Sequence, residues 1–214
     1  GFNRTGDLGD MVFKKYVLIN KGNLTLKDMY LGYWSDTDLG FAQDDYTGCD
    51  TSLSLGYTYN GDNNDEGFYG TPPPAIGYDF FQGPIVPALA TDSAKFLGDW
   101  RKGYRNLPMT AFTFYINSSA TYADPDLGVA AGSVQFYNYL TGYLWNGDPF
   151  VDPNTGNEVK FTLSGDPVAG TGWYEGAGFP GGPIPNDRRH VTVSYTHLTL
   201  PTSDLVKISM EGVQ

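Results

Sequence analysis

The sequence contains little cysteine and little histidine, and these shortages exclude several kinds of site. Cys49 is the only cysteine among 214 residues, so the chain has no internal disulfide, no CxxC redox motif and no cysteine-ligated zinc site. Only two histidines are present. No apolar run approaches the ~20 residues that a membrane-spanning helix requires, so we expect no membrane insertion.

Positive charge is also scarce. Thirteen lysines and arginines face 24 acidic residues, which gives a formal net charge of -11 and a sequence pI near 4.3. Such a surface repels phosphate backbones and anionic membranes, and we therefore expect no nucleic-acid partner. Aspartate greatly outnumbers glutamate, a bias typical of turns and calcium loops. The only glutamates are Glu66, Glu158, Glu175 and Glu211.

Aromatic residues and turn-forming residues are abundant. The chain has 16 Tyr and 13 Phe, together with 28 Gly and 14 Pro that interrupt any long helix. This composition predicts a mainly β protein, in the form of a β-sandwich-like domain with long loops and one short helix. The hydrophobic fraction of 40% is sufficient for a real core.

Local patterns predict the individual elements. Residues 11–20 are β-prone and are followed by the turn sequence NKGN, so we expect a hairpin with residues 26–34. Residues 51–60 alternate apolar and polar side chains as a strand does. The helix is expected within 132–145, with Ser133 as its N-cap. Further strands are expected at 95–100 and 109–117.

The stretch WSDTDLGFAQDDYTGCD, residues 34–50, concentrates carboxylates in what we expect to be one loop. No lysine or arginine lies between its aspartates, so their mutual repulsion favours a bound hard cation, and calcium is the natural ion. The spacing departs from an EF-hand, so the site would be irregular. The alternative is a set of turn aspartates that face water. The predicted ligands are Asp36, Asp38, Asp44 and Asp45.

A second acidic loop follows at residues 61–67. Together with the asparagine at position 60, the stretch reads NGDNNDEG. Asp62 and Asp65 are the predicted calcium ligands there, with glycines that permit the turns. A solvated hairpin tip is the alternative.

Aromatic residues offer a different kind of surface, one that binds a sugar or a peptide. Trp173 and Tyr174 lie in the glycine-rich stretch GTGWYEGAGFPGGP, so we expect this pair to be the most exposed. The alternative is that the aromatic residues simply form the core of a β-sandwich.

Catalytic motifs are absent: the sequence contains no GxSxG, HExxH or P-loop motif. An aspartate-dependent glycoside hydrolase needs only two carboxylates, but no pair is singled out. Whether the protein is an enzyme is left open, and the sequence favours a non-catalytic role.

The C-terminal segment resembles a cloning artefact. Residues 193–202, VSYTHLTLPT, match residue for residue a known translation of the transposase-type adapter used in DNA library preparation. The similarity extends over about 192–206. A genuine alternating strand is the alternative reading. We expect one domain over residues 1–191, as a fragment of a longer chain, and an artefactual tail over 192–214. His197 lies in that tail, which leaves His190 as the only native histidine.

The remainder of the chain resembles a known group of proteins. The stretch from KKYVLINKGN through SLGYTYNGDNND, together with GYDFFQGPIVP and NLPMTAFTFYIN, is similar to a family of large, uncharacterised secreted proteins. They occur in bacteria that use type IX secretion, and many of them end in a C-terminal sorting domain. The resemblance implies a secreted or cell-surface location, where millimolar calcium can fill weak acidic sites. No catalytic residues are carried over from this family, because none are established for it.

These observations lead to a ranked set of expectations. The first is a non-catalytic extracellular structural or adhesion module, stabilised by calcium, whose partner is a surface glycan or protein. The alternative is a carbohydrate-binding module of a secreted protein. The second alternative is the glycoside hydrolase.

Overall fold

The computed structural model describes residues 3–96, 98–179, 184, 186–196 and 205–213. Its strands far outnumber its helices, which confirms the predicted mainly β, sandwich-like class. Long loops connect the strands, and α1 (Ala130–Leu140) is the only α-helix in this part of the chain. None of the described helices is long and apolar enough to span a membrane.

The elements follow the chain in a simple order. Two short 3-10 turns, η1 (Asp7–Gly9) and η2 (Glu175–Ala177), accompany the strands. The strands are β1 (Met11–Ile19), β2 (Met29–Asp36), β3 (Asp45–Asp50), β4 (Leu55–Asn60), β5 (Ala75–Gln82), β6 (Ile85–Pro87), β7 (Ser93–Phe96), β8 (Asp99–Lys102), β9 (Tyr104–Asn106), β10 (Ala111–Ile116), β11 (Phe150–Val151), β12 (Glu158–Val159), β13 (Arg188–Thr196) and β14 (Leu205–Val213).

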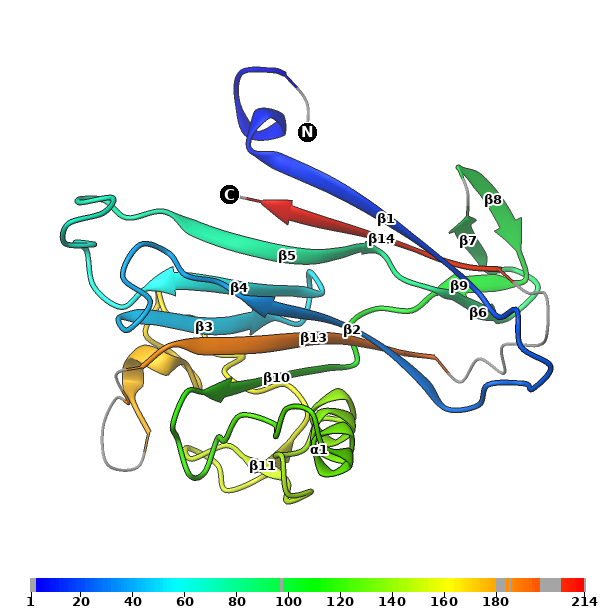
Figure 1. Cartoon of the computed structure of the whole chain (residues 1–214). Coiled ribbons are helices and arrows are strands. Elements are labelled where there is room, and N and C mark those ends of the chain that lie inside the picture. The colour runs from blue at the N-terminus through cyan, green and yellow to red at the C-terminus, as the bar shows by residue number, and fades with distance from the viewer. Residues whose placement is uncertain (1–2, 97, 180–183, 185, 197–204, 214) are drawn as a thin grey trace.

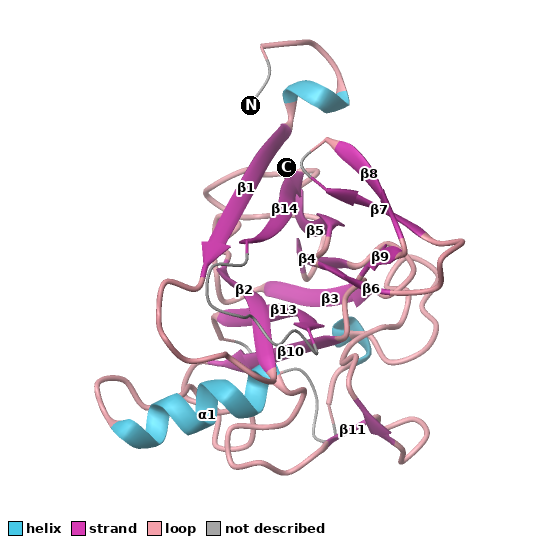
Figure 2. Ribbon diagram, turned by 90° about the vertical axis from the view of Figure 1, so that its right-hand side faces the viewer, coloured by secondary structure: helices cyan, strands magenta, loops and turns pink. Residues whose placement is uncertain are grey.

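Two antiparallel sheets form the body of the molecule. The larger has the order β1-β14-β5-β4-β3, and the smaller has the order β10-β13-β2. Figure 1 shows β3, β4 and β5 above β13 and β10, with α1 below the smaller sheet. The three-stranded sheet is therefore the middle layer, between the five-stranded sheet and a layer made of α1 and loops (Figure 2).

The position of β10 in the middle layer explains why five of its six residues are apolar or aromatic. Its sequence is AFTFYI and all six residues are buried, as expected for a strand that is covered on both faces. Phe112 belongs to the core on the side of Cys49 and Phe80, whereas Tyr115 belongs to the core that includes Tyr139 of α1. One strand thus contributes to both hydrophobic cores.

The predicted hairpin between residues 11–20 and 26–34 is wrong. Both segments form strands, but β1 pairs with β14, and β2 pairs with β13 in the other sheet. The decisive contacts lie far away in sequence. A Cβ at Gly32 would lie 2.4 Å from Leu140 Cδ2 and 2.9 Å from Val191 Cγ1, so the missing side chain at this position lets β2 approach both α1 and β13.

Two further boundaries differ from the sequence prediction. Residues 45–50 do not belong to the acidic loop but form β3, which pairs with β4 in a hairpin. The helix begins at Ala130 rather than after Ser133, and Val129 occupies its N-cap without a side-chain hydrogen bond. It ends before Gly142, whose φ of 81° is left-handed. The expected strand at 95–100 is instead divided between β7 and β8, so that Lys95 pairs with Trp100 and Phe96 with Asp99.

The segment that resembles an adapter lies in strands wherever the structure describes it. β13 extends on both sides of residue 191, where the sequence predicted the end of the domain, and it is the central strand of the smaller sheet. β14 lies between β1 and β5 in the larger sheet. Thr192, Val193 and Ser194 are buried. Residues 197–204 lie outside the described part. The artefactual origin of the tail, and the domain boundary drawn from it, remain predictions.

Gly56 provides a test of how the two sheets pack. A Cβ at this position of β4 would lie 2.4 Å from Thr192 Oγ1 in β13 and 2.8 Å from Phe112 Cε2 in β10. We expect Gly56→Ala to lower the free energy of unfolding by about 1–3 kcal/mol, because it overpacks the space between the sheets. Chemical denaturation of the full chain measures this.

Gly22→Ala is the matched control for this substitution. Its Cβ would lie 3.2 Å from Asn20 Oδ1 at the end of a side chain and 3.9 Å from Leu24 N, so we expect little change in stability. Equal stabilities of the two variants would contradict the packing of β4 on β13.

Candidate functional site

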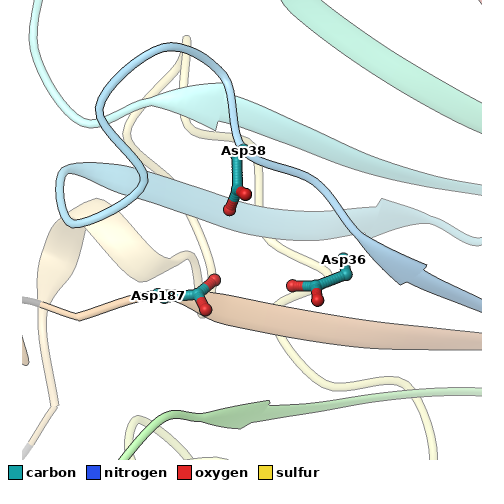
Figure 3. A group of neighbouring side chains, drawn as sticks. All are labelled: Asp36, Asp38 and Asp187. Carbon is teal, nitrogen blue, oxygen red and sulfur yellow. The ribbon is translucent and has the colours of Figure 1, made fainter.

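Three aspartates converge at one end of the middle sheet. Asp36 is the last residue of β2, Asp38 follows it in the next loop, and Asp187 immediately precedes β13. One carboxylate oxygen from each can be chosen so that all three lie within 4.8 Å of one another. Figure 3 shows the three side chains directed toward a common space. Such a group of hard oxygen atoms is suited to a divalent cation.

The pairing of β2 with β13 explains this convergence. Asp36 is opposite Arg189 in the antiparallel register, which places the start of β13 beside the end of β2. The sequence predicted Asp36 and Asp38 as ligands of one site, and the structure brings these two together. It did not predict Asp187, because no local pattern relates residue 187 to residues 36–38.

Arg189 is the cation already present at this cluster. Its Nε lies 3.0 Å from Asp36 Oδ1, its Nη2 2.5 Å from Asp187 Oδ2, and its Nη1 3.2 Å from Asp124 Oδ1. The contact with Asp36 and Asp187 raises the pKa of the arginine against the opposing effect of burial. One positive charge therefore faces four carboxylates, counting Asp38, and the group retains a negative excess.

One oxygen of the cluster has no partner. Oδ1 of Asp187 is buried and makes no hydrogen bond to any described residue, because Arg189 uses only Oδ2. Burial raises the pKa of Asp187, Arg189 lowers it, and the neighbouring Asp36 and Asp38 raise it further. An unpaired buried carboxylate oxygen is costly, and a cation bound beside it would remove that cost.

Asp45 of the first loop and Asp65 of the second loop hold backbone groups instead. Oδ2 of Asp45 accepts a hydrogen bond from Leu39 N at 2.7 Å, and Asp65 accepts hydrogen bonds from Phe41 N and Tyr69 N. Asp65 from the second loop thus fastens the first loop. Asp44 lies nearby, and the charge of Asp65 contributes to the raised pKa of Asp44, whose main cause is desolvation.

Asp45 is the most strongly perturbed of these carboxyl groups. Only 1% of the residue is exposed, and its Oδ1 has no hydrogen-bond partner among the described residues. Desolvation raises its pKa to about 7, the hydrogen bond from Leu39 opposes this, and the charges of Asp44, Asp38 and Asp65 add to the rise. The carboxyl group of Asp45 is therefore largely protonated in mildly acidic solution.

Asp62 has a purely local role in the structure. Its Oδ1 accepts a hydrogen bond from Asn64 N at 2.7 Å, an Asx turn at the exposed tip between β4 and β5. Asp62 and Asp65 are therefore not brought together as two ligands of one ion: Asp62 stabilises a turn, and Asp65 is buried under the first loop.

The expectation that Trp173 is exposed is wrong. Only 4% of this residue is exposed, and it belongs to the core below the middle sheet, while Tyr174 is half-buried. Another part of the chain packs closely against the Trp173 backbone. Gly165 donates a hydrogen bond from its N to Trp173 O at 2.7 Å, and a Cβ at Gly165 would lie 2.7 Å from the Trp173 backbone. Because Gly165 has no side chain, its backbone can pack closely against the backbone of Trp173.

Three described side chains of types that often perform catalysis lie in the interior. His190 is buried between the rings of Tyr78 and Phe112, with centroid distances of 5.3 and 5.2 Å, and burial lowers its pKa to about 3. Cys49 is buried, and burial raises the pKa of its thiol. Glu175 is fully buried in an ion pair with Arg188. None of these groups is placed to meet a substrate at the surface.

Comparison with known proteins gives no assignment. No protein-family model matches this chain, and neither a curated protein nor a solved structure matches it significantly. The geometry of the described residues is therefore the basis for any functional conclusion.

Asp45 gives a prediction for the pH dependence of stability. Its folded pKa is near 7 and its ordinary value is 3.8, so the folded state binds the extra proton between these values. The resulting stabilisation is complete below about pH 4 and is lost as the pH rises through 7. We expect Asp45→Asn, compared with wild type in EDTA, to gain stability progressively from pH 4 to pH 8.

Asp50→Asn is a control of opposite sign. Hydrogen bonds from Ser52 lower the pKa of Asp50, so its ionised form stabilises the fold above its ordinary pKa. Denaturation across the pH range should show Asp50→Asn losing stability relative to wild type as the pH rises. A parallel response of the two variants would contradict the assignment for Asp45.

Proposed function

We propose that this protein is a non-catalytic extracellular structural or adhesion module, and that calcium binds at Asp36, Asp38 and Asp187. The observation that carries the proposal is the convergence of the three carboxylates within 4.8 Å, with one buried oxygen left unpaired. The extracellular location rests on the resemblance to secreted proteins of bacteria with type IX secretion.

The chemistry of the cluster favours calcium among common cations. Calcium takes six to eight oxygen ligands in flexible geometry and tolerates backbone carbonyls and water in the set. Arg189 occupies Asp36 Oδ1 and Asp187 Oδ2, so the cation would use the remaining oxygens of these residues and the exposed carboxylate of Asp38. Weak binding is sufficient outside the cell, where calcium reaches millimolar concentrations.

A structural role agrees with where the cluster lies. A cation at this position would join the end of β2 to the start of β13, and so reinforce the edge of the middle sheet. The burial of His190 and Cys49, and the pairing of Glu175 with Arg188, support the non-catalytic part of the proposal.

Asp38→Asn is the sharpest test of the calcium site. Asp38 is exposed, so its loss should not disturb the fold. Calcium at ten times its Kd stabilises a protein by about 1.4 kcal/mol, which corresponds to a rise in Tm of about 3–6 °C for a chain of this size. We expect this rise for the wild-type chain and little or none for Asp38→Asn. Thermal melts in calcium and in EDTA measure it.

Asp10→Asn is the matched control, because it removes one exposed carboxylate from the N-terminal segment. It should keep the full calcium response. No calcium response in the wild-type chain, or an equal response in Asp38→Asn, would overturn the assignment of the site.

A further inference from the structure

Positive charge is concentrated in one short segment of this acidic chain. No lysine or arginine occurs between Lys27 and Lys95, yet residues 95–105 contain Lys95, Arg101, Lys102 and Arg105 with a single acid, Asp99. In space, this segment forms β7, β8 and β9. Figure 1 shows it at the opposite end of the molecule from the loops that follow β2 and β4. The molecule is therefore electrostatically asymmetric.

The hairpin β7–β8 has an inner face and an outer face. Ala94 and Phe96 are 0% and 4% exposed, so their face packs on the protein. Lys95 pairs with Trp100, and Ser93 pairs with Lys102, in the antiparallel register. Because side chains alternate along a strand, Lys95, Trp100 and Lys102 share the outer face.

Trp100 is the central residue of that face. It is 68% exposed, although an indole ring is costly to leave in water. Lys95 Nζ lies 5.2 Å from its ring centroid, on the opposite strand. Lys102 follows two residues along the same strand, at a spacing of about 6.6 Å. The outer face thus presents an aromatic ring with one lysine across the hairpin and a second lysine two residues along the same strand.

The hairpin is held firmly to the rest of the fold. Asn106 in β9 accepts a hydrogen bond from Lys95 N at 2.9 Å and donates hydrogen bonds to Lys95 O at 3.1 Å and Gly83 O at 3.0 Å. Gly103 N also donates to Asp92 O at 2.9 Å. The outer face is therefore preorganised, which reduces the ordering cost of binding.

From this arrangement we infer that the outer face of β7–β8 binds an anionic polysaccharide, one whose sugar rings carry carboxylates. The flat face of a sugar ring would stack on the indole of Trp100, and carboxylates on neighbouring sugars would pair with the ammonium groups of Lys95 and Lys102. The indole is thus complementary to the sugar ring, and the ammonium groups are complementary to the carboxylates. This inference deepens the adhesion role proposed above by naming a ligand class, and it does not require calcium.

A second copy of the chain is the competing occupant, because its acidic loops would also attract the lysines. Such a contact would depend on charge and would not need an exposed indole. The effect of replacing Trp100 on binding therefore distinguishes a polysaccharide from a second copy of the chain. Self-association of the protein tests the second copy directly.

The experiment measures binding of the full chain to alginate oligosaccharides and to neutral dextran, in EDTA. We expect binding to alginate and none to dextran. Lys95→Gln with Lys102→Gln should weaken alginate binding about tenfold and flatten its salt dependence. Trp100→Ala should weaken it about fivefold without changing the salt dependence.

Matched controls exist on other parts of the surface. Lys21→Gln with Lys27→Gln removes two exposed lysines, and Phe81→Ala removes an aromatic side chain that is also 68% exposed. Both variants should bind alginate as wild type does. The use of EDTA separates this result from the calcium site, whose failure would leave binding to alginate unchanged.

Several results would overturn the inference. These are no binding to alginate, equal binding to dextran, equal losses in the control variants, or unchanged binding by Trp100→Ala. Concentration-dependent self-association in analytical ultracentrifugation that the double lysine variant abolishes would assign the face to a second copy of the chain instead.

Discussion

A buried ion pair between Glu175 and Arg188 organises the acidic end of this molecule. The two side chains are 0% and 1% exposed, and Glu175 Oε1 lies 2.5 Å from Arg188 Nε. Glu175 Oε2 accepts a hydrogen bond from Thr47 N at 2.6 Å, and the guanidinium donates to the carbonyls of Asn186 and Ile184. Charges buried in this way are tolerated because their hydrogen-bonding groups are occupied. The pair fastens η2 to β3 and to the start of β13.

The position of the acidic cluster depends on that anchor. Asp187 and Arg189 flank Arg188 on either side in the sequence, so a strand fixed at Arg188 presents both of them away from the buried pair. Arg189 then meets Asp36 at the end of β2. The buried charge pair thus fixes the backbone that carries Asp187 and Arg189, and with it the place where the three carboxylates converge.

Several potentially reactive side chains lie in the interior of the fold. His190 lies neutral between the two sheets, and Cys49 and Glu175 are also buried. The surface, by contrast, separates an acidic end from a cationic hairpin with an exposed tryptophan. The two proposals above rest on these two chemically different ends: the acidic end is the proposed cation site, and the cationic hairpin is the proposed site for a charged ligand.

The sequence alone determined the mainly β class, the single helix and the clustering of carboxylates near Asp36 and Asp38, because alternation, turn residues and local charge are properties of short segments. Only the tertiary structure decided that β2 pairs with β13, that Asp187 completes the cluster, and that Asp45 and Asp65 hold backbone groups. It also placed Trp173 inside and Trp100 outside. The physical reason is that partners far apart in sequence decide burial and strand pairing, and no local pattern encodes which partner a segment will meet.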